Sequence, residues 1–168
     1  MTIERSRRRI GRARLRAVAG ELLGASTLCA IATVSRGSRA HVNTAYFAWA
    51  PDLRLVWLSD PTAAHSRNLR ASDSAAVAVY DSAQTWGQPD RGIQLFGSAR
   101  EAGDGAEQVY AARFRDYSAA QQSSYRLYEL VPRRVKLFDE DALGAGTFVT
   151  ARVLRDGTLV WERTELYG

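Results

Sequence analysis

Side chains that could bind an anion are grouped around one short segment. Five residues there carry hydroxyl, imidazole or guanidinium groups: Ser59, Thr62, His65, Ser66 and Arg67. The segment from Thr62 to Arg70 is predicted to be a helix, because Asp60-Pro61 precedes it and Thr62 is a suitable N-cap. Polar side chains beside free backbone N–H groups at a helix start suit a phosphate. We therefore predict an anion-binding corner, with a capped helix and a solvated face as the alternative.

The elements that must position this corner are short strands with few helices between them. Strands are predicted at Leu28–Val34, Ala40–Ala48, Leu53–Leu58, Ala75–Tyr80, Gly92–Ala99, Leu127–Val131, Arg134–Phe138, Phe148–Leu154 and Leu159–Glu165. Further helices are predicted at Ile10–Leu23, which is amphipathic, and at Asp104–Tyr117. This order favours a mainly β protein with helices (α+β), built as a barrel of six or more antiparallel strands.

Three local features refine the strand predictions. The continuous apolar run Leu28–Val34 is typical of a strand buried on both faces. Cys29, the only cysteine, lies in that run and is expected to be a small buried hydrophobic residue. Pro132 is expected to separate two strands, since it has no N–H to donate to a ladder.

The basic charge of the chain is concentrated at its start. Seven of the 23 basic residues lie in the first sixteen positions, opposed there only by Glu4, and the rest of the chain carries 16 basic and 17 acidic residues. We expect residues 1–26 to form a basic arm and helix, and residues 27–168 to form a single domain. A nucleic-acid-binding domain face is not indicated, although the arm remains a candidate contact for a phosphate-rich partner.

Several kinds of active site lack the residues they need. The sequence has no glycine-rich dinucleotide or nucleoside-triphosphate loop, and no Gly-x-Ser-x-Gly nucleophile motif. His41 and His65 are its only histidines, so no metal site is predicted. Any chemistry is then expected to depend on an organic cofactor. No signal peptide or membrane span is recognised, so a cytoplasmic protein without membrane contact is expected.

Four segments, in this order, are similar to the pyridoxamine 5'-phosphate oxidase-like family of FMN-binding split β-barrels. They are Leu28–Ser35, Val56–Leu69, Ala75–Asp81 and Arg91–Ala99. The resemblance implies a split β-barrel that works as a homodimer, with the cofactor at the subunit interface. The C-terminal segment Trp161–Gly168 does not match the substrate-binding end of the true vitamin B6 oxidases, so that activity is not expected.

The resemblance also implies which residues contact the cofactor. Asn43, Thr44, Ala45 and Tyr46 would lie along the flavin ring, with Gln94 on a neighbouring strand. The phosphate would be held by the segment that contains Leu58, Ser59, Thr62, His65 and Ser66. Trp86 and Arg91, in and after a polar loop, would come from the second subunit. No catalytic residue is assigned.

The function expected from these residues is that of an FMN-dependent oxidoreductase, transferring hydride between flavin and an unidentified small molecule. A reductase of the same superfamily that uses the deazaflavin coenzyme is one alternative. A flavin- or haem-binding sensor or carrier without turnover is another.

Overall fold

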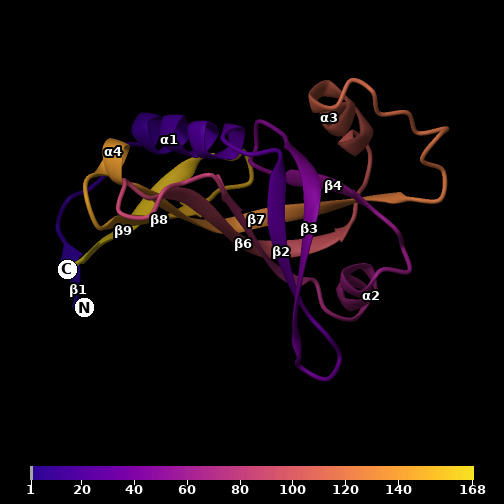
Figure 1. Ribbon diagram of the computed structural model, residues 1–168, viewed down its shortest axis with the longest axis horizontal. Coiled ribbons are helices and arrows are strands. Elements are labelled where there is room, and N and C mark those ends of the chain that lie inside the picture. The colour runs from indigo at the N-terminus through magenta and orange to yellow at the C-terminus, as the bar shows by residue number, and fades with distance from the viewer. Residues whose placement is uncertain (1) are drawn as a thin grey trace. The chain divides into compact units, whose positions relative to one another are not determined.

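The structure, a computed structural model, describes residues 2–168 (Figure 1). Its strands are β1 (Ile3–Ser6), β2 (Leu28–Val34), β3 (Ala40–Trp49), β4 (Leu55–Ser59), β5 (Ser74–Tyr80), β6 (Arg91–Glu101), β7 (Arg126–Asp139), β8 (Thr147–Val153) and β9 (Leu159–Tyr167). Its helices are α1 (Arg12–Gly24), α2 (Ala64–Ala71), α3 (Ala106–Arg113) and α4 (Glu140–Leu143).

The strands form one continuous antiparallel arrangement that closes into a barrel. Their order is β1-β9-β8-β7-β4-β3-β2-β5-β6, and β6 also pairs with β7. That last pairing closes the six strands β7, β4, β3, β2, β5 and β6 on one another, which removes the open edges of this part of the sheet. The predicted fold class, a mainly β split barrel with helices, is confirmed.

Contacts divide the chain into two compact units, which are described separately. Unit 1 contains the segment up to Ser26 together with Ala78–Leu95 and Arg133–Gly168. Unit 2 contains Thr27–Val77 and Phe96–Pro132. The candidate residues from Asn43 to Ser66 therefore all belong to unit 2, whereas Trp86, Arg91 and Gln94 belong to unit 1.

The core of unit 2 is formed by side chains on β2, β3, β4 and β7. Trp57 and Tyr128, which face each other in the β4–β7 register, are fully buried and stacked with their centroids 6.1 Å apart. A second apolar cluster joins Ala48 and Val56 to Ala106 and Tyr110 of α3. Because side chains alternate along a strand, β4 thus buries both of its faces, one in the barrel and one under α3.

Pro132 does not interrupt β7, so the predicted pair of strands is wrong. On one side of Pro132, residues 126–130 pair with β4, and on the other side residues 134–138 pair with β8. The proline lies between these two ladders, where no donor to either is needed. Gly97 of β6 approaches this point so closely that a Cβ there would lie 2.1 Å from the carbonyl oxygen of Val131.

The prediction that β2 is buried on both faces is also wrong. Its burial alternates, with Cys29, Ile31 and Thr33 buried and Leu28 and Val34 exposed at the ends. The apolar outward face of β2 therefore needs an explanation other than burial within the chain. The prediction for Cys29 is confirmed: it is buried, and this burial raises the pKa of its thiol to about 12.

Helix ends differ from the predictions for local reasons. Ala63, not Thr62, is the N-cap of α2, and it provides no side-chain hydrogen bond. Helix α3 is shorter than predicted, since the chain leaves helical geometry at Phe114. Strand β4 begins later than predicted because Leu53, with a φ of 66°, lies in a turn.

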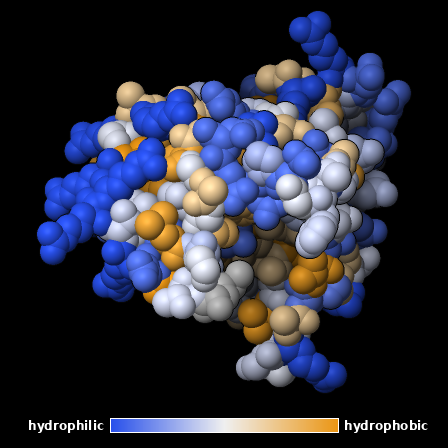
Figure 2. All heavy atoms as spheres, turned by 60° about the vertical axis from the view of Figure 1, so that its left-hand side comes forward, coloured by the Kyte–Doolittle hydropathy of each residue, from blue (hydrophilic) through white to orange (hydrophobic). Residues whose placement is uncertain are grey.

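Unit 1 is built around the hairpin of β8 and β9, which turns at Asp156-Gly157 as predicted. Strand β1, which was not predicted, pairs with the far end of β9. Helix α1 buries Leu15, Val18, Ala19, Leu22 and Leu23. Figure 2 views the molecule from the side of β1 and α1, where hydrophilic side chains cover much of the surface.

Candidate functional site

Three of the residues predicted to hold an anion, Ser59, His65 and Ser66, form a closed cluster of polar side chains beneath α2. The Oγ of Ser59 and the Nε2 of His65 are 2.7 Å apart, and the Oγ of Ser66 donates to the carbonyl oxygen of Asp60 at 2.8 Å. Ser59, His65 and Ser66 are only 7%, 4% and 0% exposed. Their hydrogen bonds to one another and to the backbone fix the start of α2 against the end of β4.

This cluster extends to the paired strands β2 and β3. The ring of His65 stacks on that of His41 of β3, with centroids 6.5 Å apart and planes 6° from parallel. Asn68 of α2 donates to the Oγ1 of the buried Thr33 on β2 at 3.0 Å. Burial, with a smaller contribution from His41, lowers the pKa of His65 below its ordinary value of 6.5. Both histidines of the chain therefore lie at one corner.

The first turn of α2 has uncapped backbone donors and mixed charge around it. No side chain caps the helix, and no acidic residue lies in its first turn. The guanidinium groups of Arg67 and Arg70 fold back onto the carbonyl oxygens of Thr62 and Pro61. The exposed carboxylate of Asp60 accepts hydrogen bonds from the backbone N–H and the hydroxyl of Thr62, which lower its pKa.

Strand β3 has a long unpaired edge next to this corner. It pairs with β2 over residues 40–46, but with β4 only at Phe47, Ala48 and Trp49. In the part of the chain that the structure describes, no other strand pairs with the remaining edge. Because Phe47 N–H donates to Thr27 on the β2 side, alternation directs the backbone groups of Val42 and Thr44 to the unpaired side.

The structure brings some predicted residues together and leaves others apart. Asn43–Tyr46 lie in the part of β3 that pairs with β2 on one edge and with no strand on the other, and Ser59, Thr62, His65 and Ser66 lie at the α2 corner. In unit 1, the Trp86 side chain is 98% exposed, and Arg91 pairs with the buried Asp139 at 3.1 Å. Gln94 is half-buried on β6. These three residues are not part of the corner within unit 2.

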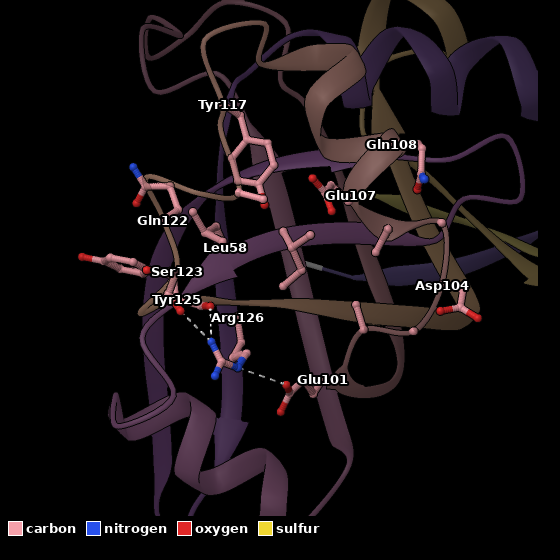
Figure 3. A pocket seen from close by; sticks show the side chains of 16 residues that line it. Leu58, Glu101, Asp104, Glu107, Gln108, Tyr117, Gln122, Ser123, Tyr125 and Arg126 are labelled. Carbon is pink, nitrogen blue, oxygen red and sulfur yellow. Dashed lines mark hydrogen bonds and ion pairs between the residues drawn. The ribbon is translucent and has the colours of Figure 1, made fainter.

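A cavity of about 670 Å³ lies in unit 2 between the start of α3, the ends of β4 and β7, and residues 117–125 (Figure 3). Of its lining residues only Leu58 was predicted as a site residue. The sequence gives no signal for the rest, because they come from two separate segments, residues 101–108 and 117–127, that carry no motif.

The closed barrel and the comparison with known proteins place the chain among the split β-barrel proteins. The chain belongs to the pyridoxamine 5'-phosphate oxidase-like family: the family described as pyridoxamine 5'-phosphate oxidase matches residues 15–139. No curated protein sequence matches the chain.

Solved structures share the fold at low sequence identity. A protein related to general stress protein 26 from Clostridium acetobutylicum, of the pyridoxinephosphate oxidase family, is 11% identical with a TM-score of 0.64, covering 86% of this chain and 97% of that one. A heme binding protein from Mycobacterium smegmatis is 20% identical with a TM-score of 0.62, covering 86% of this chain and 59% of that one. The heme storage protein HutZ from Vibrio cholerae is 19% identical with a TM-score of 0.56, covering 68% and 87%.

Within residues 2–168, no helix is both long enough and apolar enough to cross a membrane. The same residues contain no group of three or more histidine, cysteine or acidic side chains placed to hold a metal ion.

Proposed function

We propose that the chain binds FMN in unit 2, with the flavin ring along the unpaired edge of β3 and the phosphate at the start of α2. One observation carries this proposal. The unpaired edge and the uncapped helix start are neighbours, because His41 on β3 stacks on His65 on α2 at 6.5 Å. A flavin mononucleotide needs both a polar wall for its ring and a donor-rich corner for its phosphate.

The edge of β3 suits the polar side of a flavin ring. Its outward backbone groups supply both donors and acceptors, which the pyrimidine end of the ring requires. One acceptor there, the carbonyl oxygen of Thr44, is already bonded by the side-chain amide of the adjacent Asn43 at 3.1 Å. A bound ring would replace this local bond with its own donor.

The start of α2 suits a phosphate through its backbone and its arginines. Uncapped N–H groups and the helix dipole favour an anion, and Arg67 and Arg70 now bond only to neutral carbonyl oxygens at this corner. The buried side chains of Ser59, His65 and Ser66 hold the helix start in place. Asp60 opposes phosphate binding by its charge and by occupying the hydroxyl of Thr62.

When bound, FMN supplies hydride transfer to and from a small molecule. The residues of this chain bind and orient the cofactor: β3 fixes the plane of the ring, and the α2 corner fixes the phosphate. The role of the buried cluster is positional, since its hydroxyl and imidazole groups are already hydrogen-bonded to one another.

The active form is proposed to be a homodimer joined through the outward face of β2 and β3. Leu28 pairs with Tyr46, and Ala32 pairs with Val42, on that face. Val42 and Tyr46 are 63% and 58% exposed. Exposed apolar side chains in one patch mark an interaction surface, and a second copy of the same face would be self-complementary.

The direct test of the cofactor is mass spectrometry of the small molecule that co-purifies, with FMN titration of the stripped protein. The Arg67→Gln/Arg70→Gln variant is expected to bind FMN about ten-fold more weakly, since the loss of two exposed charge pairs should cost about 1.4 kcal/mol in all. The matched control is Arg115→Gln, an exposed arginine outside the corner. Equal losses of FMN affinity in both variants would contradict the assignment of the phosphate site. Colourless protein that shifts the fluorescence of the deazaflavin coenzyme would show that this coenzyme, and not FMN, is the cofactor.

The test of the dimer is the Val42→Glu variant. Val42 is exposed, so the fold should persist, while the dissociation constant of the dimer is expected to rise at least about ten-fold because a charge is buried at the interface. Light scattering across a concentration series measures this. The control is Leu154→Glu, an exposed apolar residue of unit 1. A dimer of unchanged strength in the Val42→Glu variant would exclude this face.

Haem is the second candidate, favoured by the two haem proteins that share the fold and by His41, which lies half-buried on β3. Imidazole is a common axial ligand of haem iron. The Nε2 of His65 is engaged by Ser59, so His41 is the ligand to test. A Soret band that the His41→Ala substitution shifts would support haem, and an unchanged flavin spectrum in that variant would support FMN.

A further inference from the structure

The cavity beside α3 is a concave site separate from the proposed FMN corner. Its volume of about 670 Å³ lies within the range of small-molecule pockets. Leu58, Ala106 and Leu127 supply apolar lining, and the two leucines face each other in the β4–β7 register. Leu58 directly precedes Ser59, yet it lines the cavity while Ser59 is buried with His65. The two sites are therefore on opposite faces of the same strand end.

The residues that line the cavity carry a net negative charge. Glu101, Asp104, Glu107 and Arg126 are its charged residues, which gives a net charge of −2. Arg126 is already bonded to other lining residues. Its Nε lies 3.7 Å from the Oε1 of Glu101, and its guanidinium group donates to the carbonyl oxygens of Ser123 and Tyr125 at 2.9 and 2.8 Å (Figure 3).

The remaining carboxylates of the lining have no cationic partner among the residues that the structure describes. Asp104 and Glu107 form no ion pair with any residue from 2 to 168. The N-terminus of α3 contributes about half a positive charge near Glu107, which leaves about −1.5 in the cavity. An anionic ligand is therefore disfavoured, and a cationic one is attracted.

An aromatic ring is fixed at the same place. Tyr117 lines the cavity, and its ring is held edge-on by Tyr110 of α3 with centroids 5.2 Å apart. Burial, together with the negative charge of Glu107, raises the pKa of Tyr117. Figure 3 shows the Tyr117 ring and the Glu107 carboxylate on the same side of the cavity. A fixed ring beside a carboxylate is a good environment for an ammonium group.

We propose that this cavity binds a small organic cation: an ammonium group placed between Glu107, Asp104 and the Tyr117 ring, with an apolar body against Leu58 and Leu127. The ammonium group supplies the positive charge that the cavity lacks, and the apolar body covers the apolar lining. This site requires no flavin, so it stands apart from the proposed function.

The experiment is isothermal titration calorimetry of the full-length protein, as purified, with three compounds of one shape. Benzylammonium is expected to bind at least about ten-fold more tightly than benzyl alcohol, and benzoate more weakly than either. Binding of benzylammonium should weaken as salt is added, because the carboxylates are exposed. Equal affinity for the alcohol, tighter binding of benzoate, or no heat with any compound would overturn the proposal.

Variants locate the site. Glu107→Gln is expected to weaken benzylammonium binding about three-fold to five-fold, and Asp104→Asn/Glu107→Gln about ten-fold. Glu21→Gln on α1 makes the same change of charge at an exposed position in unit 1 and should have no effect. FMN affinity should be unchanged in all three, which separates this test from that of the flavin. An equal loss in Glu21→Gln, or full binding in the double variant, would refute the site.

Discussion

Two polar regions of unit 2 share the end of β4 and differ in how their groups are satisfied. At the α2 corner, Ser59, His65 and Ser66 are buried and bonded to one another and to the backbone. At the α3 cavity, Asp104 and Glu107 are exposed and lack an ion-pair partner among residues 2–168. The first arrangement builds structure, and the second presents charge to a ligand.

The residues whose types most suggest a binding site, Ser59, His65 and Ser66, are therefore less accessible to a ligand than the carboxylates of the cavity. A buried group with a satisfied hydrogen bond costs stability when it is removed, whereas an exposed unpaired charge costs little. Substitutions of the buried Ser59, His65 and Ser66 should therefore lower the stability of the fold, and substitutions of the exposed Asp104 and Glu107 should change ligand binding alone.

The largest expected effect is on stability at the corner. His65→Ala leaves the Oγ of Ser59 without its imidazole partner in a buried site, and should lower the free energy of unfolding by about 2 kcal/mol. Urea denaturation measures this. The control is His41→Ala, which removes a histidine that is only half-buried and should lose less than about 1 kcal/mol. If both variants lose the same amount, the cluster has no special structural role.

The pH dependence of stability should follow the same histidine. Because the pKa of His65 is lowered in the folded state, the unfolded state binds its proton first as the pH falls. Stability from this group is complete above pH 6.5 and is lost as the pH falls below that value. The His65→Asn variant should flatten the dependence of stability on pH below pH 6.5 in urea titrations. A wild-type slope in that variant would assign the effect to another group.

A smaller effect is expected on cofactor affinity. Asp60→Asn removes a negative charge beside the α2 start, and should strengthen FMN binding about three-fold in fluorescence titrations. Asp73→Asn, at another exposed position of unit 2, is the control with the same charge change. Weaker binding in Asp60→Asn would mean that the carboxylate organises the corner through Thr62 instead of opposing the phosphate.

The smallest effect is expected on the free energy of unfolding of the cavity variants. Glu107→Gln should change the free energy of unfolding by less than about 0.5 kcal/mol, since its carboxylate has only the α3 dipole to lose. Urea denaturation beside His65→Ala makes the comparison directly. A loss as large as that of His65→Ala would give Glu107 a structural role and remove the contrast between the two regions.

Much of the fold was predictable because its signals are local. Alternating or continuous apolar runs located β2, β3, β5 and the β8–β9 hairpin, and the order of the segments indicated the barrel. The continuity of β7 through Pro132 was not predictable, because it depends on which strand pairs on either side. The unpaired edge of β3 was not predictable for the same reason, because it depends on how few residues of β3 pair with β4.

The two regions also differ in how well the sequence predicts them. The α2 corner was found because Ser59, Thr62, His65 and Ser66 follow one another along the chain. The cavity was missed because it joins Leu58, residues 101–108 and residues 117–127, and none of these segments has a motif. Because the fold brings the charged residues of this cavity together from separate segments, the sequence alone does not show that they share one site.

A comparison of FMN with riboflavin, which has the same ring and no phosphate, measures what the phosphate site contributes to binding. If the phosphate binds at the α2 start, FMN should bind at least about ten-fold more tightly, and Arg67→Gln/Arg70→Gln should reduce that ratio to nearly one. Equal affinities for the two flavins in the wild-type protein, or an unchanged ratio in the variant, would exclude a phosphate site at the α2 start.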